Sequence, residues 1–308
     1  MGFITDEKVY DRMFIPLRNL VKDLKPYDNL YLSAIGARIC YSSDHPLDLI
    51  QNDERIVNKD RRISFLSKLV KAKHYSVFAH SPVFFNCHWA DIEAFSRLYK
   101  AYVWPDGSAC LNARHLTEIL QTVPEVNDTP FEHQFYRYDF QRKEWAKGIK
   151  EKNEKEILAF VIPHEPWGWI SIIAHGYSRA MTHQFVRHTW LNFSQRSHRY
   201  TYVDGYVTPY SAFLHDIRNI KGERVPANLF FSEAYDNADT YYAVMINNGI
   251  PKEDARYVTP VGARTTIMAS APFFVWMDFV KKRNHSKAQW EIRELAFAVA
   301  QVLDEFLW

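Results

Sequence analysis

The sequence predicts a single mixed α/β domain over residues 1–308, with one inserted region at about residues 89–168. Three observations predict this fold class. Short strand-like runs come early, one buried strand lies in the middle of the chain, and regular helices fill the last third. Between residues 89 and 168 the pattern is irregular and is interrupted by Pro and Gly.

The elements expected in the first two thirds follow from the spacing of apolar residues. Apolar side chains that recur every three or four residues indicate a helix, and short apolar runs indicate a strand. These patterns predict helices at residues 61–73 and 177–188, and strands at residues 83–85 and 169–174. In the second helix, Tyr177, Met181 and Phe185 recur every four residues.

Three helices are expected in the last third. The first covers residues 227–248 and is closed by Gly249 and Pro251, a common way to end a helix. The second runs from about residue 271 to 282, with Pro272 in its first turn. The third has a buried stripe formed by Ala288, Ile292, Leu295, Ala296, Val299, Val302 and Leu303.

Charge and cysteine content restrict the partners and the compartment. The formal net charge of +2 is too small for a protein that mainly binds a polyanion, so no nucleic-acid partner is expected. The three cysteines show no C-x-x-C spacing, which favours a reducing cytoplasm. Charged residues interrupt the N-terminus early, and no apolar run approaches the ~20 residues of a membrane-spanning helix. A soluble cytoplasmic protein without a membrane partner is expected.

Residues 184–200 contain the densest group of polar donors. A helix that carries Gln184 and Arg187 continues into a loop rich in guanidinium, amide and hydroxyl groups. An arginine presents a planar fork that can meet two phosphate oxygens at once. The segment could therefore bind an anion, although donor chemistry alone favours a polar loop that faces water.

The same segment resembles a known family signature. Residues 187–189, Arg-His-Thr, are followed by seven residues and then by Ser-His-Arg-Tyr at 197–200. Flavin-dependent thymidylate synthases are similar: they carry Arg-His-Arg, seven residues and Ser, usually followed by x-Arg-Tyr. Residues 193–195, Phe-Ser-Gln, also resemble that family, whereas Thr189 replaces the third motif residue.

Other segments resemble the same family in the same order. Residues 73–80, Lys-His-Tyr-Ser-Val-Phe-Ala-His, are similar to its Gly-His-x-Ser-x-x-Glu-His, with Ala79 in place of Glu. Residues 250–260 are similar to its helix ending in Ala-Arg-x-x-Leu-Pro. The matches together cover residues 35–42, 73–86, 172–202 and 245–300. Each match alone is weak, but their combination is specific.

The resemblance implies a sheet with long helices, a homotetramer with shared active sites, and a pyrimidine nucleoside monophosphate as substrate. It assigns the phosphate and sugar to positions matching Gln184, Ser197, Arg199 and Arg256, and the base to those matching Arg187 and Arg283, with His198 beside them. A fixed guanidinium beside the ring stabilises charge that develops on the pyrimidine carbonyls. Arg283, assisted by Arg187, is therefore the expected catalytic residue.

The positions that match the family's flavin contacts are only partly suitable. His74, Ser76, His188 and Gln195 keep polar side chains, and they are the expected cofactor-binding residues. The family's Glu is Ala79, its third motif Arg is Thr189, and its Arg in Asn-x-Arg is Phe274. A phenyl ring can stack, but it cannot donate to a pyrophosphate. These changes predict that flavin is held differently, held weakly or absent.

The implied activity is one-carbon transfer to C5 of a pyrimidine nucleotide, as in the conversion of dUMP to dTMP. Methylenetetrahydrofolate supplies the one-carbon unit, FAD is the redox cofactor, and NADPH is the reductant. Two alternatives remain open. A pyrimidine nucleotide hydroxymethylase acting on dUMP, UMP or dCMP would capture the methylene with water, and an inactive homologue would only bind the nucleotide.

No metal site is expected. The spacing of Asp91, Glu93, His115 and Glu118 matches no known ligand geometry, so exposed helix residues are the preferred interpretation. His74, His80 and His88 are expected to pack or to cap helices rather than to bind a metal.

Overall fold

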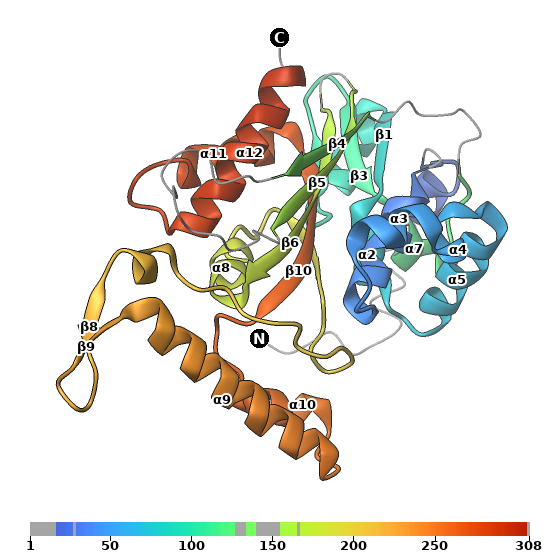
Figure 1. Ribbon diagram of the computed structural model, residues 1–308. Coiled ribbons are helices and arrows are strands. Elements are labelled where there is room, and N and C mark those ends of the chain that lie inside the picture. The colour runs from blue at the N-terminus through green and yellow to red at the C-terminus, as the bar shows by residue number, and fades with distance from the viewer. Residues whose placement is uncertain (1–16, 27–28, 127–133, 140–154, 165–166, 307–308) are drawn as a thin grey trace, which may run out of the picture.

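The computed structural model describes residues 17–26, 29–126, 134–139, 155–164 and 167–306 (Figure 1). Its centre is a five-stranded antiparallel sheet in the order β4-β5-β6-β10-β7. The strands are β4 Gln134–Asp139, β5 Glu156–Ile162, β6 Trp169–Ser178, β7 Asn192–Gln195 and β10 Arg264–Pro272. The mixed α/β class predicted from the sequence is confirmed.

Helices cover both faces of this sheet, and β5 shows why. Its side chains alternate: Ile157, Ala159 and Val161 belong to one core, and Leu158, Phe160 and Ile162 belong to the other. The first core includes residues of α8 Arg179–Phe185, α11 Phe273–Arg283 and α12 Trp290–Phe306. The second includes residues of α2 Leu30–Tyr41, α3 Pro46–Asn52, α4 Glu54–Val57, α5 Lys59–Lys71 and the 3₁₀ helix η1 Tyr75–His80.

A smaller antiparallel sheet, β1-β3-β2, lies on the N-terminal side. It consists of β1 Pro82–Asn86, β2 Tyr102–Val103 and β3 Ser108–Asn112, and it is accompanied by the 3₁₀ helix η2 Trp89–Asp91, α6 Ile92–Ser96 and α7 Ala113–Leu120. Val83 and Leu111 from the sheet pack with Phe95 and Leu116 from the helices in a third, smaller core.

The helix α9 Ala227–Asn247 and the hairpin of β8 Asp216–Arg218 and β9 Arg224–Pro226 extend away from the body (Figure 1). Only Ala227, Ala238 and Tyr242 of this long helix are buried. Gly249 follows it with a φ of 85°, as expected for a glycine that ends a helix. The short helices α10 Lys252–Ala255 and η4 Arg256–Val258 then lead back to β10, and η3 Tyr210–Phe213 precedes the hairpin.

Most elements predicted from periodicity are confirmed: α5, β1, β6, α9, α11 and α12 match the expected ranges to within a few residues. The expected helix at 177–188 is shorter than predicted. Tyr177 and Ser178 are the last residues of β6, and α8 ends at Phe185, so Arg187 lies beyond the helix. Pro272 ends β10 and caps α11 instead of lying in its first turn.

The range 89–168 contributes to the central sheet through β4 and β5. Sequence periodicity did not reveal β5 because every residue in it is buried, which leaves no polar alternation. That this range is an insertion in the family fold stays a prediction.

His80 packs in the interior, as predicted. Its Nδ1 lies 2.7 Å from Ser270 Oγ in β10, and its Nε2 lies 2.9 Å from Ser194 Oγ in β7. Gly36 of α2 leaves room for the ring, because a Cβ there would lie only 2.5 Å from His80 Cδ2. His88 caps η2 by accepting a hydrogen bond from the Ala90 amide, so the expected packing and capping roles of these two histidines are confirmed.

Candidate functional site

The segment that resembles the family signature begins where β6 ends. Ser178 is the N-cap of α8, because its Oγ accepts a hydrogen bond from the Met181 amide at 3.1 Å. After α8 the chain returns as β7 beside β10, and the amide of Arg196 donates to the Thr266 carbonyl. The amide of Arg179 donates to the Ala263 carbonyl. The start of α8 and the turn at residues 196–201 are thus both held against residues 261–266.

The first group of cations, the Arg256 cluster, lies at the start of α8 and consists of Arg179, His198, Arg199 and Arg256. Arg199 Nε donates to Glu253 Oε2 at 2.8 Å, and Arg256 Nε donates to the Glu253 carbonyl at 3.0 Å. Burial and, secondarily, Arg256 lower the pKa of Arg179, so these two guanidinium groups are close. Among the residues that the structure describes, Arg179 has no carboxylate partner.

His198 is the buried member of the Arg256 cluster, with only 1% of its surface exposed. Burial, followed by the charges of Arg179 and Arg196, lowers its pKa to about 4, so the imidazole is neutral at pH 7. Its buried Nε2 has no hydrogen-bond partner within the described part of the chain. The preceding Ser197 opens a turn in which the amides of Tyr200 and Thr201 donate to its carbonyl. The cluster therefore collects positive charge around one neutral histidine.

The second group, the Arg283 pair, lies beyond the other end of α8. Arg283 Nε at the end of α11 donates to His188 Nε2 at 2.8 Å, and the His188 ring meets Phe279 edge-on. Burial first, and then Arg283, lower the pKa of His188 to about 4. Arg187 is exposed beside this pair, and its amide donates to the Gln184 carbonyl.

The helix α8 connects the two groups. It has seven residues, which correspond to roughly 10 Å along a helix axis, and Arg187 lies two residues beyond its end. Gln184 lies between the two groups and is half-buried. The structure therefore separates the expected nucleotide-binding residues and does not bring them into one compact cluster. His198, Arg199 and Arg256, with Ser197 next in sequence, lie at the start of α8, Arg187 and Arg283 lie beyond its end, and Gln184 lies between. A nucleoside monophosphate has a similar layout, because its phosphate and its base lie at opposite ends of the molecule.

The expected cofactor-binding residues differ in their surroundings. His74 and Ser76 lie at the start of η1, are exposed, and have no side-chain partner within the described ranges. Gln195 Nε2 donates to Thr182 Oγ1 at 3.0 Å, so its amide is already used inside the protein. His188 is held by Arg283. His74 and Ser76 thus present exposed polar side chains at the start of η1, whereas His188 and Gln195 already have partners within the protein.

Three of the four acidic and histidine residues considered as metal ligands already have protein partners. His115 is buried and not exposed as expected, because its ring accepts from the Asn112 amide and lies 2.8 Å from the Tyr99 carbonyl oxygen. Glu118 pairs with Arg114, and Glu93 pairs with Arg97. The residues that the structure describes include no group of three side chains suited to a metal ion. They also include no helix long and apolar enough to cross a membrane.

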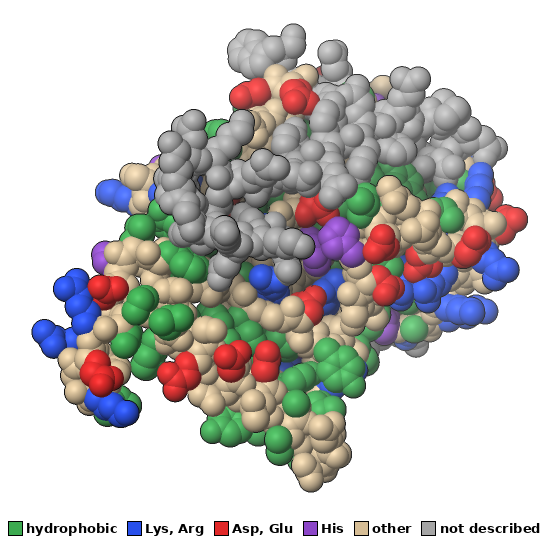
Figure 2. All heavy atoms as spheres, viewed as in Figure 1, with side chains coloured by type: hydrophobic (Ala, Val, Ile, Leu, Met, Phe, Trp, Pro, Cys, Tyr) green, Lys and Arg blue, Asp and Glu red, His purple; other side chains and the backbone are tan. Residues whose placement is uncertain are grey.

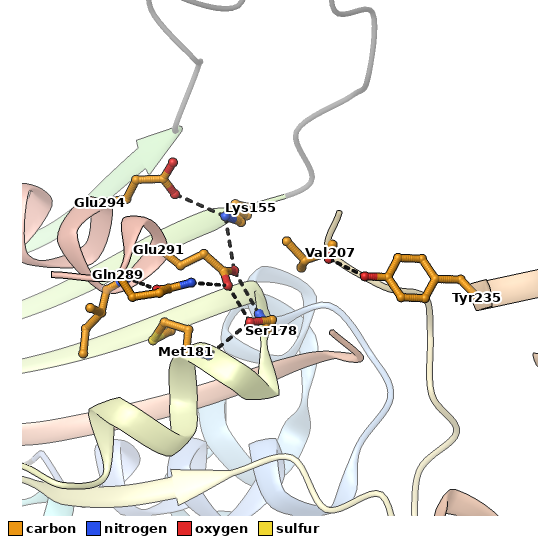
Figure 3. Close-up of polar contacts among 9 residues, drawn as sticks. Lys155, Ser178, Met181, Val207, Tyr235, Gln289, Glu291 and Glu294 are labelled. Atoms are coloured by element: carbon orange, nitrogen blue, oxygen red, sulfur yellow. Dashed lines mark hydrogen bonds and ion pairs between the residues drawn. The ribbon is translucent and has the colours of Figure 1, made fainter. Parts of the chain in front are cut away.

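Sequence reasoning missed the charged network that supports α8 (Figure 3). Glu291 of α12 accepts hydrogen bonds from both the amide and the hydroxyl of Ser178. Lys155 Nζ lies 3.3 Å from Glu291 and 3.2 Å from Glu294, and 3.7 Å from the centre of the Trp290 ring. Lys155 and Glu291 are almost completely buried. Arg179 was also missed, because it precedes the signature by eight positions.

These features define a mixed α/β protein with two arginine- and histidine-containing groups at the ends of α8. Residues 131–307, more than half of the chain, match the family model of the thymidylate synthase complementing protein. The chain therefore belongs to this family. The matched range includes both groups, but it does not include His74 and Ser76.

Individual relatives agree with the family. The flavin-dependent thymidylate synthase of Sulfolobus acidocaldarius is 34% identical over 173 residues, which cover 53% of this chain and 62% of that protein. The one from Geobacter sulfurreducens is 33% identical over 172 residues, which cover 51% of this chain and 70% of that protein. A solved structure of the UMP/dUMP methylase PolB from Streptomyces cacaoi matches 45% of this chain and 67% of its own at 20% identity, with a TM-score of 0.39, a similarity too weak to support an argument. The chain thus spans less than two thirds of the Sulfolobus relative.

Removing the buried cation of the network should destabilise the protein strongly. We expect Lys155→Met to lower the free energy of unfolding by about 3–5 kcal/mol, because Glu291 would remain buried without a partner charge. Urea unfolding at one protein concentration measures this. The double variant Lys155→Met/Glu291→Gln should recover part of the loss.

The control is Lys282→Met, which breaks an exposed pair with Asp278 and should cost less than about 1 kcal/mol. An equal effect of Lys155→Met and Lys282→Met would contradict a supporting role for the network.

Proposed function

We propose that this chain transfers a one-carbon unit to C5 of a pyrimidine nucleoside monophosphate, in the conversion of dUMP to dTMP. The observation that carries the proposal is the pair of cationic groups at the two ends of α8. Family membership and relatives named flavin-dependent thymidylate synthase support it. The Arg256 cluster is suited to a phosphate, and the Arg283 pair is suited to a base.

At the phosphate end, Arg179, Arg199 and Arg256 supply charge, and Ser197 supplies a hydroxyl. Guanidinium groups held close together repel each other, and a phosphate between them removes this repulsion. Glu253 already fixes the direction of Arg199 through Nε and Nη2. Gln184 and His198 complete this side, with the neutral His198 available for a hydrogen bond. These residues orient the nucleotide and take no part in bond making.

At the base end, Arg283 and Arg187 stabilise negative charge on the pyrimidine carbonyls while C5 attacks the methylene carbon. The new carbon–carbon bond forms at C5, the C5 proton is lost, and tetrahydrofolate leaves. His188 accepts a hydrogen bond from Arg283 and so limits the directions that this guanidinium can take. A preorganised cation of this kind lowers the barrier without any rearrangement during the step.

For the cofactor we propose FAD, held by His74, Ser76, His188 and Gln195, with NADPH as reductant. When bound, the reduced flavin would supply the hydride that completes the methyl group. The side chains at Ala79, Thr189 and Phe274 carry no donor for a pyrophosphate except one hydroxyl, so we propose weak binding. Without a hydride, water would complete the reaction and give the hydroxymethyl nucleotide.

The activity test follows tritium release from the 5-position of dUMP, UMP and dCMP in the presence of methylenetetrahydrofolate. We expect release from dUMP. Arg283→Ala should lower kcat by about 10²- to 10³-fold, because it removes charge stabilisation at the base. Arg179→Ala and Arg199→Ala should weaken nucleotide binding by roughly 10- to 100-fold, as expected for a lost charge-assisted hydrogen bond.

Arg97→Ala changes an exposed residue that directly follows α6 and lies outside both groups; it serves as the control and should match the parent. If no nucleotide loses its label under any cofactor condition, the protein is at most a nucleotide-binding homologue and the proposed activity is wrong.

The flavin proposal is tested by the visible absorbance of the purified protein before and after addition of FAD. We expect little bound flavin after dialysis, and recovery of the flavin bands when FAD is added. Phe274→Arg restores a donor at an exposed position and should tighten FAD binding. Dihydrofolate or dTMP formed at full rate without any flavin would exclude this cofactor.

We further propose that the chain forms a homotetramer in which α9 is part of the interface. Leu229, Phe230, Tyr241 and Val244 on α9 are 45–59% exposed, and apolar side chains reach the surface along this helix in Figure 2. Exposed apolar surface of this extent marks an interaction site.

The three unpaired cysteines agree with a reducing compartment, for which we propose the cytoplasm.

Light scattering after size-exclusion chromatography tests the assembly. The parent protein should elute with the mass of four chains. Leu229→Glu/Phe230→Glu should shift it to smaller species, because charge at a buried interface is costly. A double change on the exposed face of α5, Arg61→Glu/Lys68→Glu, should leave the mass unchanged. A monomeric parent protein would disprove the proposal.

A further inference from the structure

Three side chains from one short segment hold the loop that follows His188. Tyr99 Oη donates to the Thr189 carbonyl at 3.0 Å, and Tyr102 Oη donates to the Trp190 carbonyl at 3.4 Å. Lys100 Nζ donates to the Leu191 carbonyl at 2.5 Å and to Asn192 Oδ1 at 3.1 Å. We call Tyr99, Lys100 and Tyr102 the clasp. It binds the carbonyl groups of three consecutive residues.

The position of this loop matters because it begins at Arg187 and His188. The loop has few hydrogen bonds of its own: the His188 amide donates to the Phe185 carbonyl, and the Leu191 amide donates to the His188 carbonyl. The clasp therefore supplies the contacts that fix the directions of its next three carbonyl groups. Hydrogen bonds at three consecutive carbonyl groups restrict rotation of the peptide groups in this loop.

Lys100 has two unfavourable properties at this place. Its backbone φ is 61°, in the left-handed region that residues other than glycine rarely adopt. Its ammonium group is partly buried, and burial lowers its pKa to about 8. The acceptors that it reaches are uncharged carbonyl and amide oxygens. A strained backbone and a partly desolvated cation at one residue indicate a position that the surrounding structure holds for a purpose.

The clasp also contacts the element that carries Arg283. The ring of Tyr102 meets the ring of Phe274 edge-on with 5.0 Å between centroids, and it lies 6.1 Å from the Trp190 ring. Phe274 is in the first turn of α11, and Arg283 is its last residue. One segment thus touches both the loop that carries His188 and the helix that carries its partner.

We propose that the clasp is a positioning device: it fixes the loop after α8 against α11, so that Arg283 meets His188 and the base end of the site is preorganised. The clasp residues belong to the region 89–168, so the proposal assigns a positioning role to this part of that region. Its effect on turnover rests on the proposed function, whereas its effect on the contact between Arg283 and His188 does not. Tyr99, Lys100 and Tyr102 are positioning residues, because they act through the loop after α8 and through α11.

The direct test is the titration of His188, followed by NMR of histidine-labelled protein and assigned with His188→Gln. In the parent protein the pKa is about 4, because burial and the charges of Arg283 and Lys282 lower it while Asp278 raises it. In Lys100→Met, and to a lesser extent in Tyr99→Phe, the loop should loosen and the pKa should rise toward the ordinary 6.5. Tyr99 is 66% exposed, so Tyr99→Phe removes one hydroxyl from a surface position and should fold normally.

Lys68→Met on the exposed face of α5 is the matched control and should leave the His188 titration unchanged. An unchanged pKa of His188 in both folded clasp variants would overturn the proposal.

The second readout separates positioning from general stability. With dUMP as substrate, the clasp variants should lower kcat by about 10- to 100-fold, as expected when a reacting group is misplaced by a small distance. KM should stay within about threefold, because the phosphate end is untouched. A rise in KM at constant kcat would contradict the proposal. If the parent protein releases no tritium from any nucleotide, the proposed function fails, and the NMR titration alone decides on the clasp.

Discussion

The junction between β6 and α8 is the constraint on which the rest of the site depends. Ser178 ends the strand, caps the helix and donates to Glu291, all within one residue. The direction of α8 is therefore set by a hydrogen bond to a carboxylate on α12, and that carboxylate is neutralised by Lys155. Because both cationic groups are defined by the ends of α8, an error in this direction would displace them in opposite senses.

The two groups show how charge is distributed along this short helix. At its start, burial lowers the pKa of His198 and the charges of Arg179 and Arg256 lower it further, so this imidazole stays neutral. Beyond its end, His188 is also kept neutral, but here the imidazole accepts from Arg283. Clusters of like charge are unfavourable in an empty protein and become favourable when an anion enters. The repulsion within the Arg256 cluster is therefore one that a bound anion would remove.

The sequence predicted the fold class, the helix α9 from the Gly249 and Pro251 that follow it, and the periodic helix α12, because each of these depends on neighbours in the chain. It could not predict β5, in which both faces are buried, or the network of Lys155 and Glu291, whose members are far apart in sequence. The clasp could not be predicted from the sequence either. Its side chains bind backbone carbonyl groups, and a carbonyl group can accept whatever side chain its residue carries. The resemblance predicted a candidate site, whereas the residues that support α8 were found only in the structure.

The close approach of α2 to the sheet has a consequence for how the sequence can vary. A side chain at Gly36 would collide with the ring of His80, and that ring bridges Ser194 and Ser270 on two strands. Volume added at Gly36 must therefore be removed at His80. That removal would take one hydrogen-bond partner from Ser194 and one from Ser270, which keeps Ser171 as a partner at 2.7 Å. The two positions are coupled through excluded volume, so substitution at either is restricted although neither belongs to the proposed site.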